Sequence, residues 1–194
     1  MYSDPPSSQA GLKPEVKRMS EEPIFSVINA GALQRRVAAL QEMAVLDTPP
    51  EEGFDALTRL AANVCETPIA LVSLIDGSRL WFKSTHGLTQ RSIDSEGSFC
   101  CETANSKRTL EVADPRLDPR FANNGLVTGN LGIRYYAAAP IIYHDVGIGT
   151  VCVLDIVPRK LGERPLRALA EMAHIATVML TARVDAFRLL ATSR

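Results

Sequence analysis

The sequence predicts an α+β fold in which antiparallel hairpins pack against flanking helices. Two segments, residues 68–85 and 135–155, each have the pattern of a strand, a tight turn and a second strand. Helical patterns precede the first hairpin, and the longest helical pattern of the chain follows the second, at residues 163–190. Consecutive hairpins favour an antiparallel sheet, which the apolar faces of these helices would cover.

The second hairpin is built from small side chains. Its first strand contains three successive alanines, residues 137–139, and its second strand contains Gly147. Residues of this size let a helix, another backbone or a ligand come close, so the hairpin should form the floor of a pocket or a packing surface. Tyr135 and Tyr136 should point to opposite faces. Pro140 should lie at an edge or a bulge, because it has no N–H to donate.

The composition indicates one domain and excludes several classes of partner. The chain has 194 residues, 46% of them hydrophobic, and its 21 basic and 22 acidic residues give a net charge of −1. This balance argues against a nucleic-acid partner, and no apolar run approaches the roughly 20 residues of a membrane span. There is no signal-peptide pattern and no disulfide framework, so we expect a cytoplasmic protein. The cysteines show no zinc-site spacing, and we expect neither a metal ion nor a cofactor.

The N-terminal part of the chain divides into an arm and the start of the folded domain. Residues 1–24 are rich in serine, proline and charge, which predicts a disordered arm, and residues 25–194 should form a single domain. Apolar residues at helical spacing predict a first helix over residues 33–44. Thr48, with Glu51 three residues later, predicts a capping box at the start of a second helix.

The first strand of the first hairpin should lie at the centre of the sheet. Residues 68–75 are apolar throughout, as in a strand that is buried on both faces. Alternation along the returning strand places Leu80 and Phe82 on one face, and Trp81 and Lys83 on the other.

A long excursion precedes the second hairpin. A short helix is expected at residues 99–106 and a short strand at 110–112. Residues 113–132 then contain two Asp-Pro pairs and further turn signals, which predict a long structured segment rather than a strand or a helix. Such a segment next to a floor of small residues is typical of a lid.

The C-terminal helix, residues 163–190, is longer than the sheet that it must cover. At 1.5 Å per residue it would span roughly 42 Å, against roughly 17–20 Å for a typical strand, so its end should protrude. We therefore expect Leu180, Phe187 and Leu190 to lack an intradomain partner and to form a coiled-coil contact in a dimer or with another protein. Arg183 interrupts this stripe and would weaken the contact unless it meets an acidic residue.

The ordered set of motifs resembles GAF domains, and most closely the bacterial GAF domains that precede diguanylate cyclases and sensor histidine kinases. The resemblance covers roughly residues 33–185. The motifs that carry it lie at residues 46–55, 71–76, 81–84, 98–100, 118–121, 133–136 and 148–155. It implies a six-stranded antiparallel sheet with helices behind it, a lidded small-molecule pocket in front, a role in signalling, and dimerisation through the terminal helices.

Three functional variants of the GAF family can be compared with this sequence. The signatures of the cyclic-nucleotide-binding and bilin-binding members are absent. Residues 97–104 resemble a cysteine segment of the free methionine-(R)-sulfoxide reductases, but the second catalytic cysteine of that branch is missing, because residues 113–132 contain none. A thiol-dependent reductase that uses Cys100 or Cys101 at the start of a helix is therefore the alternative to a non-enzymatic module. In the simpler interpretation, both cysteines only pack in the interior.

The candidate ligand-binding residues combine aromatic, thiol and charged side chains. They are Trp81, Phe99, Cys100, Asp118, Phe121, Arg134 and Tyr136. The resemblance places Trp81, Phe99 and Tyr136 nearest the pocket. Arg134 would either pair with Asp118 and hold the lid, or clamp the carboxylate of a ligand.

The sequence is therefore interpreted as a regulatory GAF module without an output domain of its own. It would bind an unknown small molecule or act in signalling, either as a homodimer through the C-terminal helix or on a separate kinase, cyclase or regulator.

Overall fold

The computed structural model describes residues 30–192, so the arm expected at residues 1–24 lies outside the described part of the chain. The structure confirms the α+β class and the six antiparallel strands, which follow the order β3-β2-β1-β6-β5-β4. The strands are β1 (Ile69–Asp76), β2 (Arg79–His86), β3 (Ser92–Asp94), β4 (Leu110–Val112), β5 (Tyr135–Tyr143) and β6 (Val146–Asp155). The helices are α1 (Ala30–Met43), α2 (Glu52–Cys65), α3 (Phe99–Ser106), α4 (Gly125–Thr128) and α5 (Glu163–Thr192), with a 3-10 turn at Pro115–Leu117.

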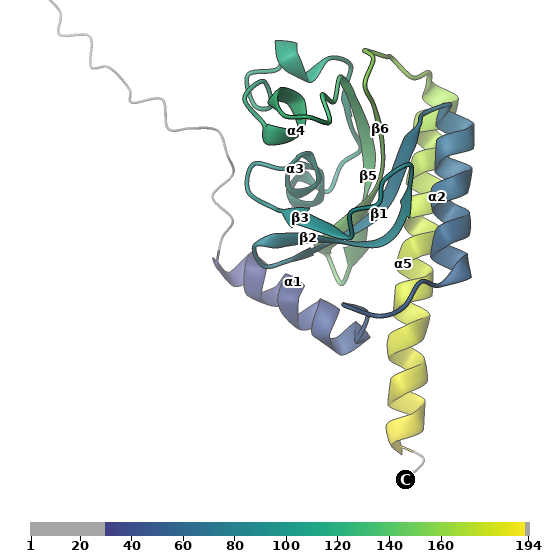
Figure 1. The fold of residues 1–194 in the computed structure, drawn as a ribbon. Helices are drawn as coiled ribbons and strands as arrows, with labels where there is room; N and C mark the ends of the chain where they lie inside the picture. Colours follow the sequence, from purple (N-terminus) through teal and green to yellow (C-terminus); the bar gives the residue numbers. More distant parts are fainter. Residues whose placement is uncertain (1–29, 193–194) are drawn as a thin grey trace, which may run out of the picture.

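The sheet separates two hydrophobic cores. On one face α2 and α5 run side by side along the sheet and α1 lies across one end of it, while α3, α4 and the lid cover the opposite face (Figure 1). β1 and β6 form the centre of the sheet, and every residue of β1 except Asp76 is buried, as its apolar run predicts. The chain thus places the lid on one face and the long helices on the other.

A bulge in β2 turns polar side chains toward the helices. Val72 pairs with Ser84, whereas Ser73 pairs with Phe82, so Lys83 is the extra residue between them. The Lys83 and Ser84 side chains consequently both reach the helical layer, where the Ser84 hydroxyl donates to Asp55 of α2 at 2.6 Å. Alternation already directs Lys83 to this face, and the bulge adds Ser84 beside it.

The second hairpin forms as predicted. Tyr135 belongs to the helix-side core and Tyr136 to the lid-side core, which confirms their opposite orientation. β4 pairs with β5 only as far as Ala138, so Pro140 lies where β5 has become an edge strand and needs no further N–H donor. The small residues serve for close packing. A Cβ at Gly147 would lie 2.0 Å from the Ala104 carbonyl oxygen of α3.

The C-terminal helix confirms one part of its prediction and corrects another. α5 extends beyond the other elements (Figure 1), and Phe187 and Leu190 are exposed, at 45% and 67%. Leu180, however, is fully buried in the helix-side core, so the expectation that it lacks an intradomain partner is wrong. The reason lies in the tertiary structure. Met43 at the end of α1 and Val45 beyond it belong to the same core as Leu180, and they extend that core along α5 beyond the sheet.

The predicted capping box at Thr48 and Glu51 is also wrong. α2 begins at Glu52, and Glu51 makes no side-chain cap bond. The Thr48 hydroxyl donates to the Val45 carbonyl at 2.6 Å and accepts from Lys83. A buried ammonium group needs several acceptors, and it recruits the two side chains that would otherwise cap the helix.

Candidate functional site

Four of the seven candidate ligand-binding residues meet between α3, the lid and the sheet. The ring of Phe99 stacks on Phe121 at 4.2 Å between centroids and on Tyr136 at 4.8 Å. These three side chains and Cys100 are 5% exposed or less. The three rings therefore fill the space in which the sequence predicts a pocket, and a ligand would have to move the lid or the rings to enter.

Cys100 lies below these rings against the centre of the sheet. Its Sγ is 4.0 Å from the Sγ of Cys152 on β6, and the Tyr136 hydroxyl donates to it at 3.5 Å. Tyr136 also contacts the Thr103 hydroxyl at 3.2 Å, and the Ser73 and Thr150 hydroxyls lie 2.9 Å apart on the neighbouring strands. This is a polar cluster at the floor of an otherwise apolar core.

The hydrogen bonds of this cluster shift the pKa values of the two thiols apart. The Cys152 thiol, then the Ser73, Thr150 and Tyr136 hydroxyls, donate toward Cys100 and lower its pKa despite burial. The pKa of Cys152 is raised well above its usual value, because its hydrogen bond to Cys100 and its burial both favour the protonated form. The pair therefore releases one proton readily and retains the second.

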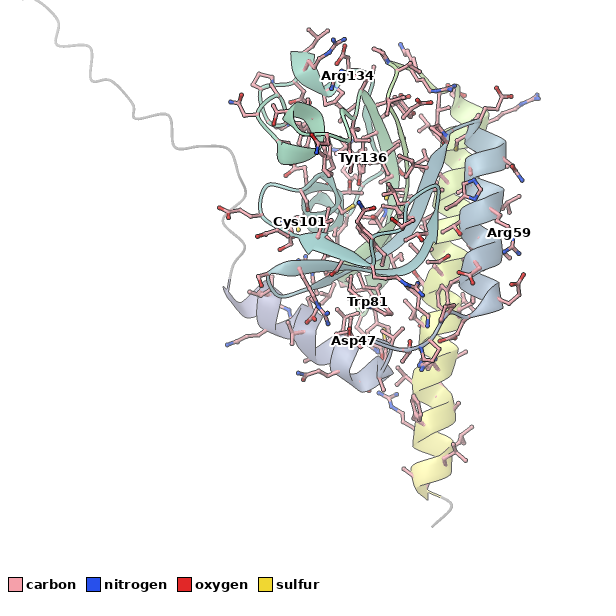
Figure 2. The ribbon with its side chains drawn as sticks, in the orientation of Figure 1. Asp47, Arg59, Trp81, Cys101, Arg134 and Tyr136 are labelled. Atoms are coloured by element: carbon pink, nitrogen blue, oxygen red, sulfur yellow. The ribbon has the colours of Figure 1, made fainter. Side chains whose placement is uncertain are left out.

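The neighbouring Cys101 points elsewhere, as expected for adjacent helix residues. Its Sγ donates to the Ser95 carbonyl at 3.4 Å, and burial raises its pKa. Figure 2 shows Cys101 near the outer side of α3, with Tyr136 closer to the sheet. Cys101 is thus separated from the thiol pair.

Arg134 holds the lid, but through backbone rather than through Asp118. Its guanidinium donates to the carbonyls of Val127 in α4 and of Ile133, both at 2.9 Å. Asp118 instead pairs with Arg120, at 3.0 and 2.7 Å. The expected pairing of Asp118 with Arg134 is therefore wrong, because Arg120, only two residues away, satisfies both carboxylate oxygens.

The lid is tied to α3 by contacts that the sequence did not reveal. The Asn124 side-chain amide donates to the Gly97 carbonyl at 2.8 Å, and Arg120 lies 3.6 Å from Glu102 of α3. Asp118 lines a shallow hollow on the outer side of the lid together with Glu111 and Asp114. Asn124 was visible only as a turn residue, and nothing in its local pattern indicated the contact with Gly97.

Trp81 is not part of this site, because it lies on the opposite face of the sheet in the helix-side core. Figure 2 shows it toward the segment between α1 and α2, away from Tyr136 and Arg134. Alternation along β2 correctly separates it from Phe82, which does face the lid. Its assignment to the pocket came from the resemblance, and the geometry gives it a packing position.

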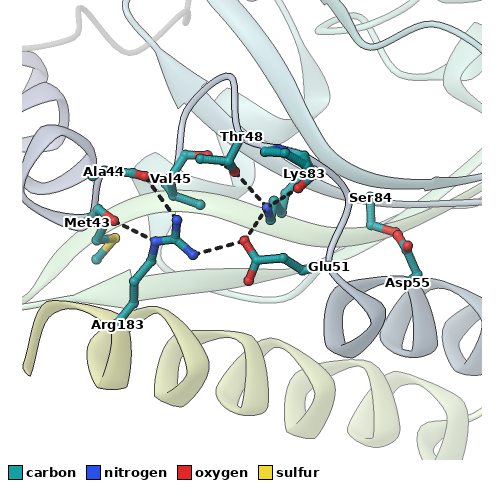
Figure 3. A network of polar contacts seen from close by, with 10 residues as sticks. Met43, Ala44, Val45, Thr48, Glu51, Asp55, Lys83, Ser84 and Arg183 are labelled. Carbon is teal, nitrogen blue, oxygen red and sulfur yellow. Dashed lines mark hydrogen bonds and ion pairs between the residues drawn. The ribbon is translucent and has the colours of Figure 1, made fainter. Parts of the chain in front are cut away.

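A second cluster of charged groups occupies the helix side of the sheet (Figure 3). The Lys83 ammonium donates to the Thr48 hydroxyl at 2.7 Å, to the Pro49 carbonyl at 2.9 Å and to Glu51 at 2.5 Å. Arg183 of α5 donates to the same Glu51 oxygen at 2.9 Å. Glu51 thereby joins the sheet to the C-terminal helix. The signal in the sequence was a lysine at an inward-facing position of a buried strand, which requires a partner.

Arg183 also fastens the end of α1. Its guanidinium donates to the carbonyls of Met43 at 2.9 Å and Ala44 at 3.2 Å. Arg183 is therefore part of an intradomain network, and the expectation that it interrupts an intermolecular seam is wrong. Those carbonyls end α1 and have no partner within the helix.

The fold and these clusters define an α+β signalling or ligand-binding domain, and comparison with known proteins identifies its family. The GAF domain model matches residues 49–180, and the chain belongs to the GAF family. A cyclic di-GMP phosphodiesterase of Pseudomonas aeruginosa is 36% identical over 154 residues, which are 79% of this chain. The chain spans 26% of the length of that protein.

Solved structures share the fold at low sequence identity. The GAF domain of Thermosynechococcus elongatus PixJ, in its blue-light-absorbing form, superimposes with a TM-score of 0.60 at 15% identity, covering 85% of this chain and 96% of that one. A type II free methionine-R-sulfoxide reductase from Thermoplasma acidophilum gives a TM-score of 0.55 at 8% identity, covering 77% and 94%. Both likenesses concern the fold alone.

Within residues 30–192, no three or more His, Cys, Asp or Glu side chains are grouped to hold a metal ion. None of the helices in this range combines the length and apolarity needed to cross a bilayer.

Proposed function

We propose that this domain is a non-enzymatic regulatory module that works as a homodimer through the outer face of α5. The observation that carries the proposal is a row of exposed side chains along that helix. Ile175, Val178 and Leu189 are 45%, 53% and 68% exposed, and Ala182 is exposed between them. With Asp185, these positions alternate steps of three and four residues, which is the spacing of a coiled-coil seam.

This seam differs from the one that the sequence suggested. Leu169, Ala173, Ala176 and Leu180 are buried in the helix-side core, and the exposed row lies on another side of the same helix. Leu60 and Val64 of the adjacent α2 are also exposed, at 47% and 37%. Exposed apolar rows on two neighbouring helices support a partner surface, and a two-fold axis beside α5 would bury the same row of both copies.

The relative from Pseudomonas aeruginosa supports a regulatory role. That protein is named as an enzyme, whereas the matched region of this chain is mostly GAF domain. We infer that the domain controls a catalytic or signalling partner of that general kind. We also infer a reducing compartment such as the cytoplasm, and the four free thiols support this.

Light scattering over a range of concentrations tests the homodimer. We expect the full chain to be dimeric, and Val178→Glu and Leu189→Glu to shift it to monomer. Leu117→Glu is the matched control, because Leu117 is an apolar lid residue that is 82% exposed and far from α5 in the chain. A monomeric full chain, or a dimer that neither seam variant weakens, contradicts the proposal.

Within the module, we infer that a small molecule enters by displacing the lid from Phe99, Phe121 and Tyr136. The support is that these rings and Cys100 lie together beneath the lid, which the hydrogen bond from Asn124 to the Gly97 carbonyl holds closed and a local opening would release.

A ligand at 100 times its Kd should stabilise the fold by about 2.7 kcal/mol. A panel of nucleotides and other metabolites, screened by thermal melting, tests this, and Asn124→Ala should strengthen binding by favouring the open lid. If no compound shifts the melting temperature of either protein, the ligand-binding half fails.

A further inference from the structure

We propose that Cys100 and Cys152 form a dithiol site that hydroperoxides oxidise to an intramolecular disulfide. Cys100 is the thiol that attacks the peroxide, and Cys152 is the thiol that resolves the product. The resulting bond would join α3 on the lid side to β6 at the centre of the sheet.

The distance between the two sulfur atoms is the first support. They lie 4.0 Å apart, on elements 52 residues distant in the chain. A disulfide needs about 2.05 Å, so side-chain rotation and a small shift of α3 bring the sulfurs together. β6 is held between two strands, whereas α3 is an eight-residue helix, and α3 is therefore the element that moves.

The surroundings of Cys100 are the second support. The Tyr136 hydroxyl donates to its Sγ at 3.5 Å, and the Ser73 and Thr150 hydroxyls lie beside the pair. Cys100 is in the first turn of α3, which Ser98 caps by accepting from the Cys101 N–H at 3.2 Å. Hydrogen bonds from Cys152 and these hydroxyls lower the pKa of Cys100 below its usual value, which favours the thiolate that reacts with peroxides.

The reaction balances with a hydroperoxide as the only oxidant. The Cys100 thiolate attacks one peroxide oxygen, the O–O bond breaks, and an alkoxide or hydroxide leaves as Cys100 becomes a sulfenic acid. Cys152 then attacks that sulfur, the S–O bond breaks and water leaves. Two thiols have lost two electrons and two protons, and the peroxide has become an alcohol, or water, plus one water.

The remaining cysteines provide internal controls. Cys101 donates to the Ser95 carbonyl and lies outside the pair, and its pKa is raised by burial. Cys65 lies in the helix-side core, where burial raises its pKa to about 11. Cys101 has the Ser98 hydroxyl beside it, but burial outweighs that hydrogen bond.

Access to the pair requires local opening of the lid side, because Cys100 is 5% exposed and Cys152 is fully buried. Asn124 holds the lid to the Gly97 carbonyl just before α3. Removing that contact in Asn124→Ala should therefore increase the rate of oxidation several-fold without changing which thiols react. A faster oxidation that gives the same disulfide would show that Asn124 controls access of the peroxide to the thiols and not which thiols react.

The experiment treats the reduced full chain with hydrogen peroxide, blocks the remaining thiols under denaturing conditions, and maps the peptides by mass spectrometry. We expect a Cys100–Cys152 cross-linked peptide that is two hydrogens lighter, with two of the four thiols still free. Cys101→Ser should give the same product. Cys152→Ser should stop at a sulfenic acid on Cys100 that dimedone traps.

Three results would overturn the proposal. They are a cross-link that includes Cys101 or Cys65, a disulfide between two chains as the main product, and a Cys100–Cys152 pair still reduced under conditions that fully oxidise glutathione. Melting curves give a second readout, since a disulfide across this span should raise the melting temperature by roughly 5–10 °C. The Val178→Glu protein is tested in parallel, because oxidation there is independent of the dimer.

Discussion

The ammonium group of Lys83 lies 2.5 Å from the carboxylate of Glu51, although the Lys83 side chain is completely inaccessible to solvent. Glu51 in turn accepts from Arg183 at 2.9 Å, so one carboxylate connects β2 of the sheet with the C-terminal helix. Lys83 follows Phe82, which belongs to the lid-side core, so neighbouring residues of β2 contact both layers of the domain.

Replacing Lys83 by methionine should destabilise the fold by about 2–3 kcal/mol. The change removes the donor to Thr48, to the Pro49 carbonyl and to Glu51, and leaves these part-buried acceptors without their shared partner. Lys107→Met is the matched control, because Lys107 pairs with the highly exposed Asp145 and should cost no more than about 0.5 kcal/mol. Urea unfolding of both variants measures the difference, and equal losses would contradict a structural role for Lys83.

The stability of the domain should depend on the ionisation of Glu51. Burial raises the pKa of Glu51, but the hydrogen bond and charge of Lys83 and the charge of Arg183 outweigh it and hold the pKa below 4.5. The carboxylate therefore stabilises the fold above its unfolded pKa, and this contribution is lost as the pH falls through the folded pKa.

Comparison with Glu51→Gln measures this contribution. At neutral pH the unchanged protein should be the more stable of the two, and the gap should shrink as the pH falls below about 4.5. Unfolding free energies across this range give the curve. A gap that does not change with pH would show that the charge of Glu51 is not what stabilises the network.

Arg183→Ala should loosen α5 at its contact with the end of α1. The variant loses the hydrogen bonds that Arg183 donates to three acceptors, the carbonyls of Met43 and Ala44 and the Glu51 carboxylate. The free energy of unfolding should fall by about 1–2 kcal/mol. Arg188→Ala provides the control, since the 60% exposed Arg188 pairs with Glu42 near the surface and should cost about 0.5 kcal/mol or less. Hydrogen exchange should show lost protection in the last turns of α5 for Arg183→Ala only.

Gly147→Ala should displace α3 from the sheet. The added Cβ would lie 2.0 Å from the Ala104 carbonyl oxygen, and a backbone atom cannot move aside as the end of a side chain can. We therefore expect the free energy of unfolding to fall by about 3 kcal/mol. Gly77→Ala is the comparison, because Gly77 has no neighbour within 4 Å and only its positive φ of 58° opposes a side chain, at about 1 kcal/mol. Thermal unfolding ranks the two, and the reverse order would contradict the close packing of α3.

The thiol-reductase alternative should fail a direct assay. Cys100 lies beneath the stacked rings of Phe99 and Tyr136, and Cys101 points away from it. We therefore expect no turnover of free methionine-(R)-sulfoxide when NADPH consumption is coupled through thioredoxin. Turnover that disappears in Cys100→Ser and persists in Cys101→Ser would instead establish the enzyme.

Local patterns were sufficient for most elements of secondary structure. Alternation separated Leu80 and Phe82 from Trp81 and Lys83, and the structure places them on the faces expected. The short helix at residues 99–106 has the predicted bounds. Prediction failed for polar side chains that had more than one possible partner. Thr48 and Glu51 bind the distant Lys83 instead of capping α2, and Asp118 binds the neighbouring Arg120 instead of Arg134.

The sequence by itself determined the fold class and the strand alternation, because periodicity and turn chemistry act over a few residues, and its ordered motifs carried the resemblance to the GAF family. The tertiary structure alone decided that Cys100 faces Cys152, that Lys83 and Arg183 share Glu51, and that Phe99, Phe121 and Tyr136 fill the expected pocket. These contacts join residues that are far apart in the chain, and they depend on the register of β1, β2 and β6 and on how closely α3 approaches the sheet. Packing sets both of these, and a local pattern cannot encode them.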